Sequence, residues 1–271
     1  MIRSLALAVA LTSVLASTTF AATFPGDAAY VPWRCRGEVM FDALGDQPPA
    51  LAERDLVGDR DAAAGLRAAD ADFLYLRIRV DQDPAPGGAL RPYAWGVEFD
   101  LDGNRATYEL LITVDGIGSP DGAVSVFTNG TTTLANSLAD PADGPAAATF
   151  AFADAARTVA TRTMIGGNTD SFVDIAVPWT TLIPLGLDRD TPVYVWVGSS
   201  SVIDALDGDI VCHDGRTGGA RLDAVVSDRT TGDPTRDPGN GGGGGGAGIP
   251  RLEGGGGCQT GGPVGLGLGL G

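Results

Sequence analysis

Apolar and polar side chains alternate along residues 73–80 of this 271-residue chain. One face carries the apolar residues Leu74, Leu76, Ile78 and Val80. The other face carries two arginines, Arg77 and Arg79. A period of two indicates a half-buried β-strand, because successive side chains point to opposite faces of a sheet. Two further segments repeat the pattern: 94–100 with Trp95, Val97 and Phe99 inward, and 107–114 with Tyr108, Leu110, Ile112 and Val114 inward.

More strand candidates follow between clusters of Asp, Gly, Pro and Asn, at 123–128, 147–152, 157–164, 172–177 and 192–198. The helix-like segment 179–185 is short and is interrupted by Pro184. Many short strands without long amphipathic helices predict an all-β fold, a single β-sandwich of jelly-roll or immunoglobulin-like two-sheet architecture. If the first three strands are neighbours, Arg77 and Arg79 pair with Glu98 and Glu109 on the outer face.

Both ends of the chain differ in composition from its middle. Met1-Ile2-Arg3, an apolar run over 5–15 and small residues before Ala22 have the order of a secretory signal peptide, with cleavage after Ala21 or Ala22. The run falls short of the ~20 residues of a spanning helix. We expect a signal peptide at 1–21, a sandwich domain at 22–228, a disordered Gly/Pro-rich linker at 229–262 and the start of a sorting or membrane segment at 263–271.

The net charge of −16 comes with arginine as the only strongly basic residue, since the chain contains no lysine. A nucleic-acid surface needs a concentrated positive patch, and none is visible in the sequence. We therefore expect no nucleic-acid partner. The acidity suits an exported protein or one that binds cations.

The chain has three cysteines, Cys35, Cys212 and Cys258. A Cys35–Cys212 disulfide is chemically permitted after export and would join the two margins of the domain. The alternative is a pair of partly buried free thiols, because sequence does not show whether the two Cα atoms approach.

Three short motifs follow one another in the predicted domain: Asp72-Phe73-Leu74-Tyr75, the acidic turn at 100–104, and the step Val177-Pro178-Trp179-Thr180-Thr181-Leu182. Their order resembles the carbohydrate-binding modules of family nine and the related DOMON-like sandwiches, over about residues 30–223. The resemblance implies a β-sandwich and favours carbohydrate as the ligand class. The chain departs from that family in lacking a recognisable pair of exposed tryptophans that would clamp a sugar.

The aromatic pair Tyr194 and Trp196 shares one face of the strand at 192–198. These side chains form either a stacking platform for a sugar or a contact beneath a loop. Trp33 and Trp179 lie beside prolines at the edges of elements, so we expect them to pack in the core.

Asp100, Asp102 and Asn104 place oxygen donors at alternating positions of one turn, as loops that bind Ca²⁺ do. An EF-hand is excluded, because glycine is at the fourth position and Leu111 is at the twelfth. The interpretations are a calcium site completed by distant carboxylates and an ordinary Asp-Gly turn between strands.

The sequence offers little for catalysis. His213 is the only histidine, neighbouring serines lack a nucleophile elbow, and no phosphate-binding loop is present. We assign no catalytic residue. The remaining catalytic hypothesis is a secreted hydrolase that acts on glycosides or esters through acidic residues.

The end of the chain reads as a glycine run, Cys258 and a Gly/Leu segment from Val264. This order resembles the MYXO-CTERM sorting tails of myxobacterial surface proteins, which implies that Cys258 is the processing and attachment residue. The spanning helix and arginine cluster of that family are missing, so the signal is truncated or degenerate; a low-complexity terminus with an incidental cysteine is the alternative. Outer-membrane or cell-surface attachment depends on a functional tail.

The functional hypothesis from sequence is a non-catalytic secreted or cell-surface binding module. Polysaccharide is the favoured partner, and Ca²⁺ is the candidate cofactor. The alternatives are the hydrolase described above and an adhesion or scaffold domain that binds another surface protein.

Overall fold

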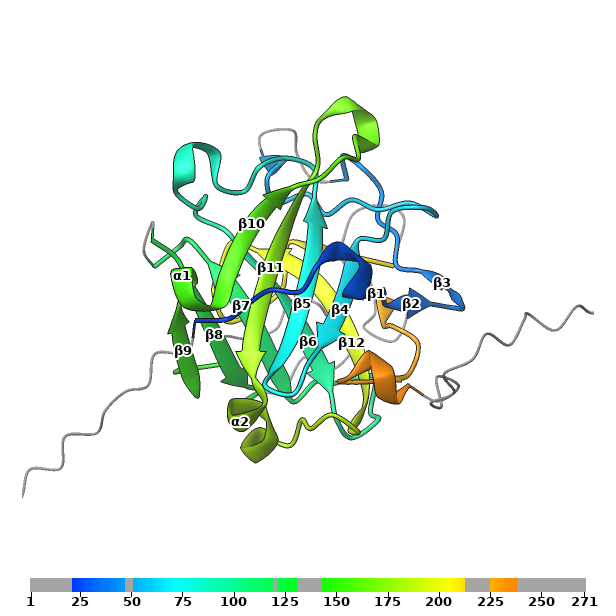
Figure 1. Cartoon of the computed structure of the whole chain (residues 1–271), viewed down its shortest axis with the longest axis vertical. Helices are drawn as coiled ribbons and strands as arrows, with labels where there is room; N and C mark the ends of the chain where they lie inside the picture. The colour runs from blue at the N-terminus through cyan, green and yellow to red at the C-terminus, as the bar shows by residue number, and fades with distance from the viewer. Residues whose placement is uncertain (1–20, 47–50, 119–120, 131–142, 213–224, 238–271) are drawn as a thin grey trace, which may run out of the picture. The chain divides into compact units, whose positions relative to one another are not determined.

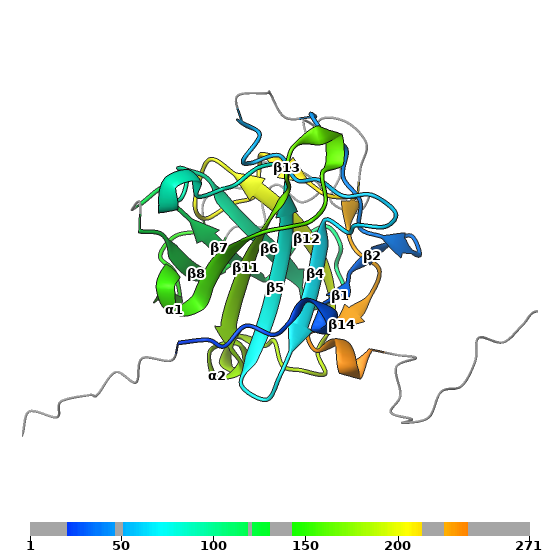
Figure 2. The same cartoon turned by 45° about the horizontal axis from the view of Figure 1, so that its top comes forward.

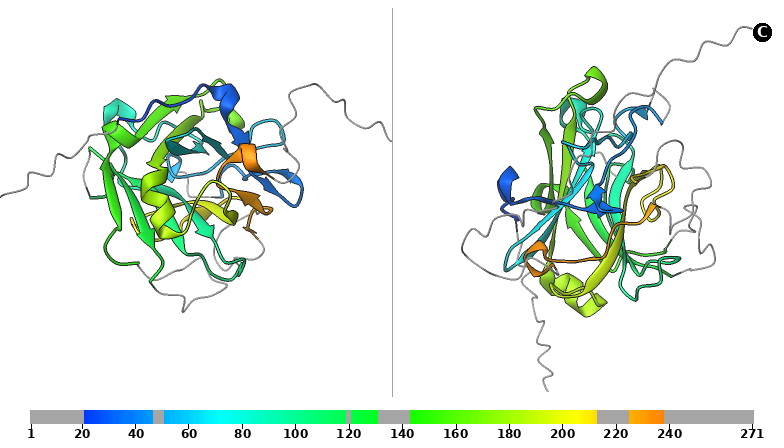
Figure 3. Two further views of the ribbon diagram at one scale, coloured as in Figure 1. Left: turned by 60° about the horizontal axis from the view of Figure 1, so that its bottom comes forward. Right: turned by 90° about the vertical axis from the view of Figure 1, so that its right-hand side faces the viewer.

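The fold is a sandwich of two antiparallel sheets, which confirms the predicted all-β class. The computed structural model describes residues 21–46, 51–118, 121–130, 143–212 and 225–237. Figure 1 looks onto the five-stranded sheet, and the right-hand view in Figure 3 shows both sheets as layers. The signal peptide, His213, Cys258 and the tail lie outside the described residues, apart from Ala21 at the signal's end.

The first sheet has the order β1-β4-β5-β11-β10, and the second has the order β13-β12-β6-β7-β8-β9 with β14 also paired to β12. The first contains β1 (Val31–Pro32), β4 (Gly65–Ala69), β5 (Phe73–Val80), β11 (Ser171–Pro178) and β10 (Ala156–Ala160). The second contains β13 (Asp209–Ile210), β12 (Pro192–Ser200), β6 (Ala94–Asp100), β7 (Leu110–Asp115), β8 (Ala123–Thr128), β9 (Ala148–Ala151) and β14 (Thr230–Thr231). A separate hairpin joins β2 (Arg34–Cys35) to β3 (Glu38–Val39).

Helical segments in the described residues are single turns. They are η1 (Asp27–Ala29), η3 (Pro86–Gly88), α1 (Phe152–Ala155), η4 (Ile165–Gly167), α2 (Trp179–Leu182), η5 (Ile183–Leu185) and η6 (Pro234–Arg236). α2 and η5 together occupy the segment 179–185 that the sequence predicts as helical.

The main core lies between the two sheets and is built from the alternating positions of the long strands. Leu74, Leu76 and Ile78 of β5 are fully buried there, together with the inward side chains of β6, β7, β11 and β12. Trp33 and Trp179 belong to the same cluster, as expected. Tyr108 does not: it precedes β7 and packs in a second cluster with Leu111, so its predicted inward position is wrong.

The predicted pairing of Arg77 and Arg79 with Glu98 and Glu109 is also wrong, because β5 and β6 belong to different sheets. The Nε and Nη2 atoms of Arg77 donate instead to the two carboxylate oxygens of Asp174 on β11, at 2.7 and 2.9 Å. Its Nη1 donates to Asp27 at 2.7 Å. The segment around η1 crosses this sheet face in Figure 1, so that Arg77 is buried rather than solvated.

The folded domain extends beyond the predicted boundary at Asp228. β14 pairs with β12, and the Asp237 carboxylate lies 2.5 Å from the guanidinium of Arg67. Asp233 is fully buried and its carboxylate binds Arg189 at 2.6 Å. Residues 229–237 therefore belong to the sandwich and not to a linker, because they supply a strand and two ion pairs that each have one buried partner.

Candidate functional site

The acidic turn after β6 brings Asp100 and Asp102 together with Glu109, which the sequence analysis did not include in the site. One carboxylate oxygen of each lies within 4.8 Å of the others. Asp100 Oδ1 accepts from the amides of Asp102 at 3.0 Å and Gly103 at 2.6 Å, and Glu109 Oε2 accepts from the Leu101 amide at 2.6 Å. Gly103 adopts φ +86°, which glycine tolerates best.

These carboxylates are close together and partly buried, so their negative charges repel one another. Burial raises the pKa of Asp100, and the charge of Asp102 raises it further. The hydrogen bond from the Gly103 amide lowers this pKa but does not cancel the increase. Burial also raises the pKa of Glu109. Asp100 Oδ2 is buried and accepts no hydrogen bond within the described part of the chain. These oxygens could hold a hard cation.

Asn104 contributes differently from what the sequence predicts. The backbone nitrogen of Asn104 donates to Asp102 Oδ1 at 2.7 Å, and the side-chain Oδ1 of Asn104 lies 3.4 Å from the backbone nitrogen of Ala106. The side chain thus lies against its own turn, and Glu109 rather than Asn104 provides the third oxygen donor beside Asp100 and Asp102. The signal for Glu109 was its place immediately before β7, next to the end of β6.

The predicted platform of Tyr194 and Trp196 does not form an exposed surface. Trp196 is fully buried in the second cluster, which covers the outer face of the seven-stranded sheet with Leu206, Val225 and other apolar residues. Tyr194 is half-buried, and the Arg105 guanidinium lies 5.4 Å from its ring centre. The reason is the chain after β12, which folds back over this face and buries both sides of the strand.

A cavity of about 590 Å³ lies beside the β2–β3 hairpin and was not predicted from the sequence. Its described lining includes Arg34 and Glu38 of the hairpin, Phe41, and the loop residues Gly58, Asp59 and Arg60. Arg34, Glu38, Asp59 and Arg60 are exposed, whereas Phe41 is half-buried. The lining therefore combines two cations and two anions with the apolar side chain of Phe41.

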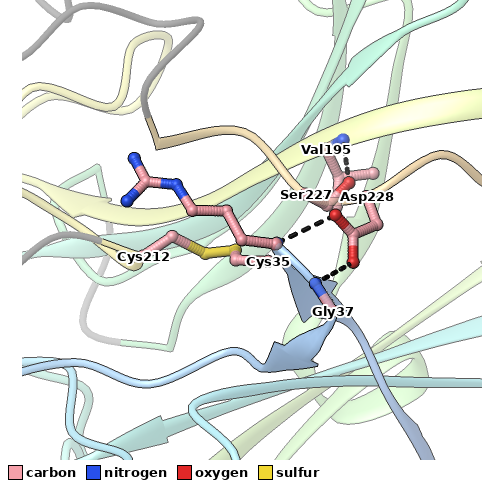
Figure 4. Close-up of a disulfide and its surroundings, with 7 residues drawn as sticks. Cys35, Gly37, Val195, Cys212, Ser227 and Asp228 are labelled. Carbon is pink, nitrogen blue, oxygen red and sulfur yellow. Dashed lines mark hydrogen bonds between the residues drawn. A yellow bond between two sulfur atoms is a disulfide. The ribbon is translucent and has the colours of Figure 1, made fainter.

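The hairpin is held in place from two sides (Figure 4). Cys35 and Cys212 form a disulfide with their Cα atoms 6.1 Å apart. The carboxylate of Asp228 accepts from the amides of Arg36 at 2.9 Å and Gly37 at 2.7 Å. Arg36 and Gly37 both have positive φ, at 54° and 83°, as a two-residue turn of type I′ requires.

Two of the serines that precede His213 in sequence, Ser199 and Ser200, make hydrogen bonds in the structure. Ser199 Oγ donates to the Arg54 carbonyl oxygen at 2.8 Å, and Ser200 Oγ lies 2.6 Å from Asp207 Oδ1. Both serines are fully buried. Neither is presented as a nucleophile.

Within the described ranges, no helix has both the length and the apolar character needed to cross a bilayer. Comparisons of the chain with protein-family models, with curated proteins and with solved structures found no match.

Proposed function

We propose that this chain is a non-catalytic exported binding module whose ligand site is the cavity beside the β2–β3 hairpin. The observation that carries the proposal is a cavity of about 590 Å³ with a wall fixed by the Cys35–Cys212 disulfide and by Asp228. Binding sites are concave and largely formed in advance, with a few polar groups that fix the orientation of the ligand. A wall that is already ordered loses little entropy when a ligand binds.

The chemistry of the lining favours an uncharged, hydroxyl-rich ligand. Arg34 and Arg60 supply planar donors, and Glu38 and Asp59 supply acceptors. The ring of Phe41 provides an apolar contact for a sugar face. Because the rim charges balance, a neutral carbohydrate fits better than a strongly anionic ligand, and the resemblance to family-nine modules points to the same ligand class.

Calcium at the acidic turn is part of this proposal. Asp100, Asp102 and Glu109 form an oxygen-only donor set, which suits Ca²⁺. The turn lies at the end of β6 where Tyr194 of β12 faces Asp100, and it does not line the cavity. Calcium would therefore stabilise the turn and would not contact the sugar.

A glycan array and affinity electrophoresis with soluble polysaccharides test the proposal directly. We expect the wild-type chain to bind at least one neutral glycan and Arg60→Ala to bind it about tenfold more weakly or worse, because a charge-assisted hydrogen bond is lost. Arg162→Ala is the matched control, since this exposed arginine lies outside the cavity lining and should bind as the wild type does. Absence of glycan binding, or turnover of a glycan by the chain, contradicts the proposal.

A further inference from the structure

Three aspartates converge at the end of the sandwich opposite the acidic turn. Asp42 pairs with Gly58 in an isolated bridge, Asp46 follows in the same loop, and Asp209 lies on β13. One carboxylate oxygen of each lies within 4.8 Å of the others. Asp209 faces Ser199 near the end of β12, whereas Asp100 faces Tyr194 near its start. β13 is seen near the top of Figure 2.

Five of the six carboxylate oxygens in this cluster are buried and have no hydrogen-bond partner among the described residues. Asp42 is only 2% exposed, and neither of its carboxylate oxygens has a hydrogen-bond partner in the described residues. Asp209 is fully buried; its Oδ2 accepts from the Leu56 amide at 2.7 Å, but its Oδ1 accepts from no described group. Both carboxylate oxygens of the half-buried Asp46 also lack such a partner.

The surrounding charges make this arrangement unfavourable without a counter-ion. Burial raises the pKa of Asp42 well above its ordinary value, and the charges of Asp209, Asp46 and Asp55 add to that effect. Burial and the charge of Asp55 likewise raise the pKa of Asp46, to about 7. Asp55 is itself held by the Gly45 amide at 2.8 Å. Arg54 lowers the pKa of Asp209, but burial and the neighbouring aspartates outweigh it.

A buried carboxylate must be protonated, paired or bound to a metal, because an isolated buried charge is very costly. The donors here are oxygens alone, which suit Ca²⁺ and not the nitrogen and sulfur sites typical of zinc. Ca²⁺ binds oxygens at about 2.3–2.6 Å, so a single ion can reach oxygens on opposite sides that lie up to about twice that distance apart. The 4.8 Å limit on the separations within the cluster meets this condition.

We propose that Asp42, Asp46 and Asp209 bind one Ca²⁺ ion, separate from the acidic turn. The ion would join the loop at 42–46 to β13 of the seven-stranded sheet. Asp42 links the proposed site to the cavity, because two of its neighbours line the cavity. It follows Phe41, whose carbonyl accepts from the Cys212 amide at 3.0 Å, and it pairs with Gly58. Ion binding therefore stiffens a wall of the cavity. Only this effect on the cavity rests on the proposed function; the calcium site itself does not.

Calcium binding to the full chain tests the site without any glycan. The chain is stripped with EDTA, dialysed against calcium chloride alone, and its bound calcium is counted. We expect Asp42→Asn and Asp46→Asn each to reduce bound calcium by one ion per chain. Asp102→Asn should remove only the ion at the other turn, and Asp190→Asn, at an exposed carboxylate, should remove none.

The half-buried Asp46 provides a variant that disturbs the fold less than a change at Asp42. In EDTA, both asparagine variants should melt at or above the wild-type temperature, because each removes a carboxylate from a repulsive cluster. Added calcium should raise their melting temperature less than it raises that of the wild type, because only the acidic turn can still bind an ion. Two results would show that the proposal is wrong. One is a folded Asp46→Asn variant that binds as much calcium as the wild type, and the other is an Asp102→Asn variant that binds no calcium at all. Failure of glycan binding leaves this result unaffected.

Discussion

Buried charges in this sandwich have two opposite environments. Asp174 is fully buried but receives hydrogen bonds from Arg77 and Arg157. Asp42 is also buried, yet its closest charged neighbours are other aspartates. An ion pair with complete hydrogen bonding balances the loss of solvation, whereas a group of like charges does not. The first environment holds the fold together, and the second requires a cation or a proton.

Replacement of the buried Arg77 should be far more damaging than replacement of the half-buried Arg157, which binds the same carboxylate. The Arg77 side chain is 2% exposed and that of Arg157 is 37% exposed, although both bind Asp174. We expect Arg77→Met to lower the free energy of unfolding by about 3–5 kcal/mol, because it leaves a buried carboxylate short of partners. Arg157→Met should cost about 1 kcal/mol or less. Urea unfolding of both variants measures the difference, and equal losses would contradict this account.

At the scale of elements, the hairpin depends on its two turn residues. Gly37 has φ +83° and nothing within 4 Å of the position that a Cβ would take, so a substitution there tests the backbone conformation alone. We expect Gly37→Ala to cost about 1 kcal/mol. Gly26 also has open space but a φ of −70°, so Gly26→Ala is the control and should be close to neutral. Urea unfolding compares the two variants, and similar losses in both would argue against a backbone effect.

Element by element, the sequence predicted what periodicity can reveal. The predicted segments 73–80, 94–100 and 123–128 coincide with β5, β6 and β8. β2 and β3 are two residues long, so they contain no alternation to detect, and the cavity that they line could not be predicted. Periodicity placed Trp196 on the face opposite the core but could not show that a later segment covers that face. Asp42 and Asp209 are brought together only by the fold.

At the scale of the whole molecule, stability should depend on pH in a way that calcium changes. In the calcium-free protein the pKa of Asp46 is about 7, and the values for Asp42 and Asp209 are also raised. In the unfolded chain an aspartate has a pKa of about 3.9. The folded state thus binds more protons between these values, so stability falls as the pH rises through that window.

We therefore expect the melting temperature in EDTA to be higher at pH 5 than at pH 7, with a smaller difference in Asp46→Asn. Saturating calcium should reduce the difference, because the ion stabilises the charged carboxylates. Below about pH 4 the trend should reverse, since groups with lowered pKa values such as Asp233 and Asp237 lose their ion pairs. A melting temperature in EDTA that rises steadily from pH 5 to pH 7 would be inconsistent with the buried cluster.

The location of the ligand site is the central claim, and an NMR titration of the ¹⁵N-labelled chain with neutral oligosaccharides tests it most directly. The backbone amides of Gly37, Gly58 and Asp59 report on the cavity, and those of Gly103 and Tyr194 report on the acidic turn and the face of β12. We predict that ligand-dependent shifts gather at the first group and leave the second unchanged. Shifts that gather instead around Gly103 and Tyr194, or no shift with any oligosaccharide tested, would contradict the claim.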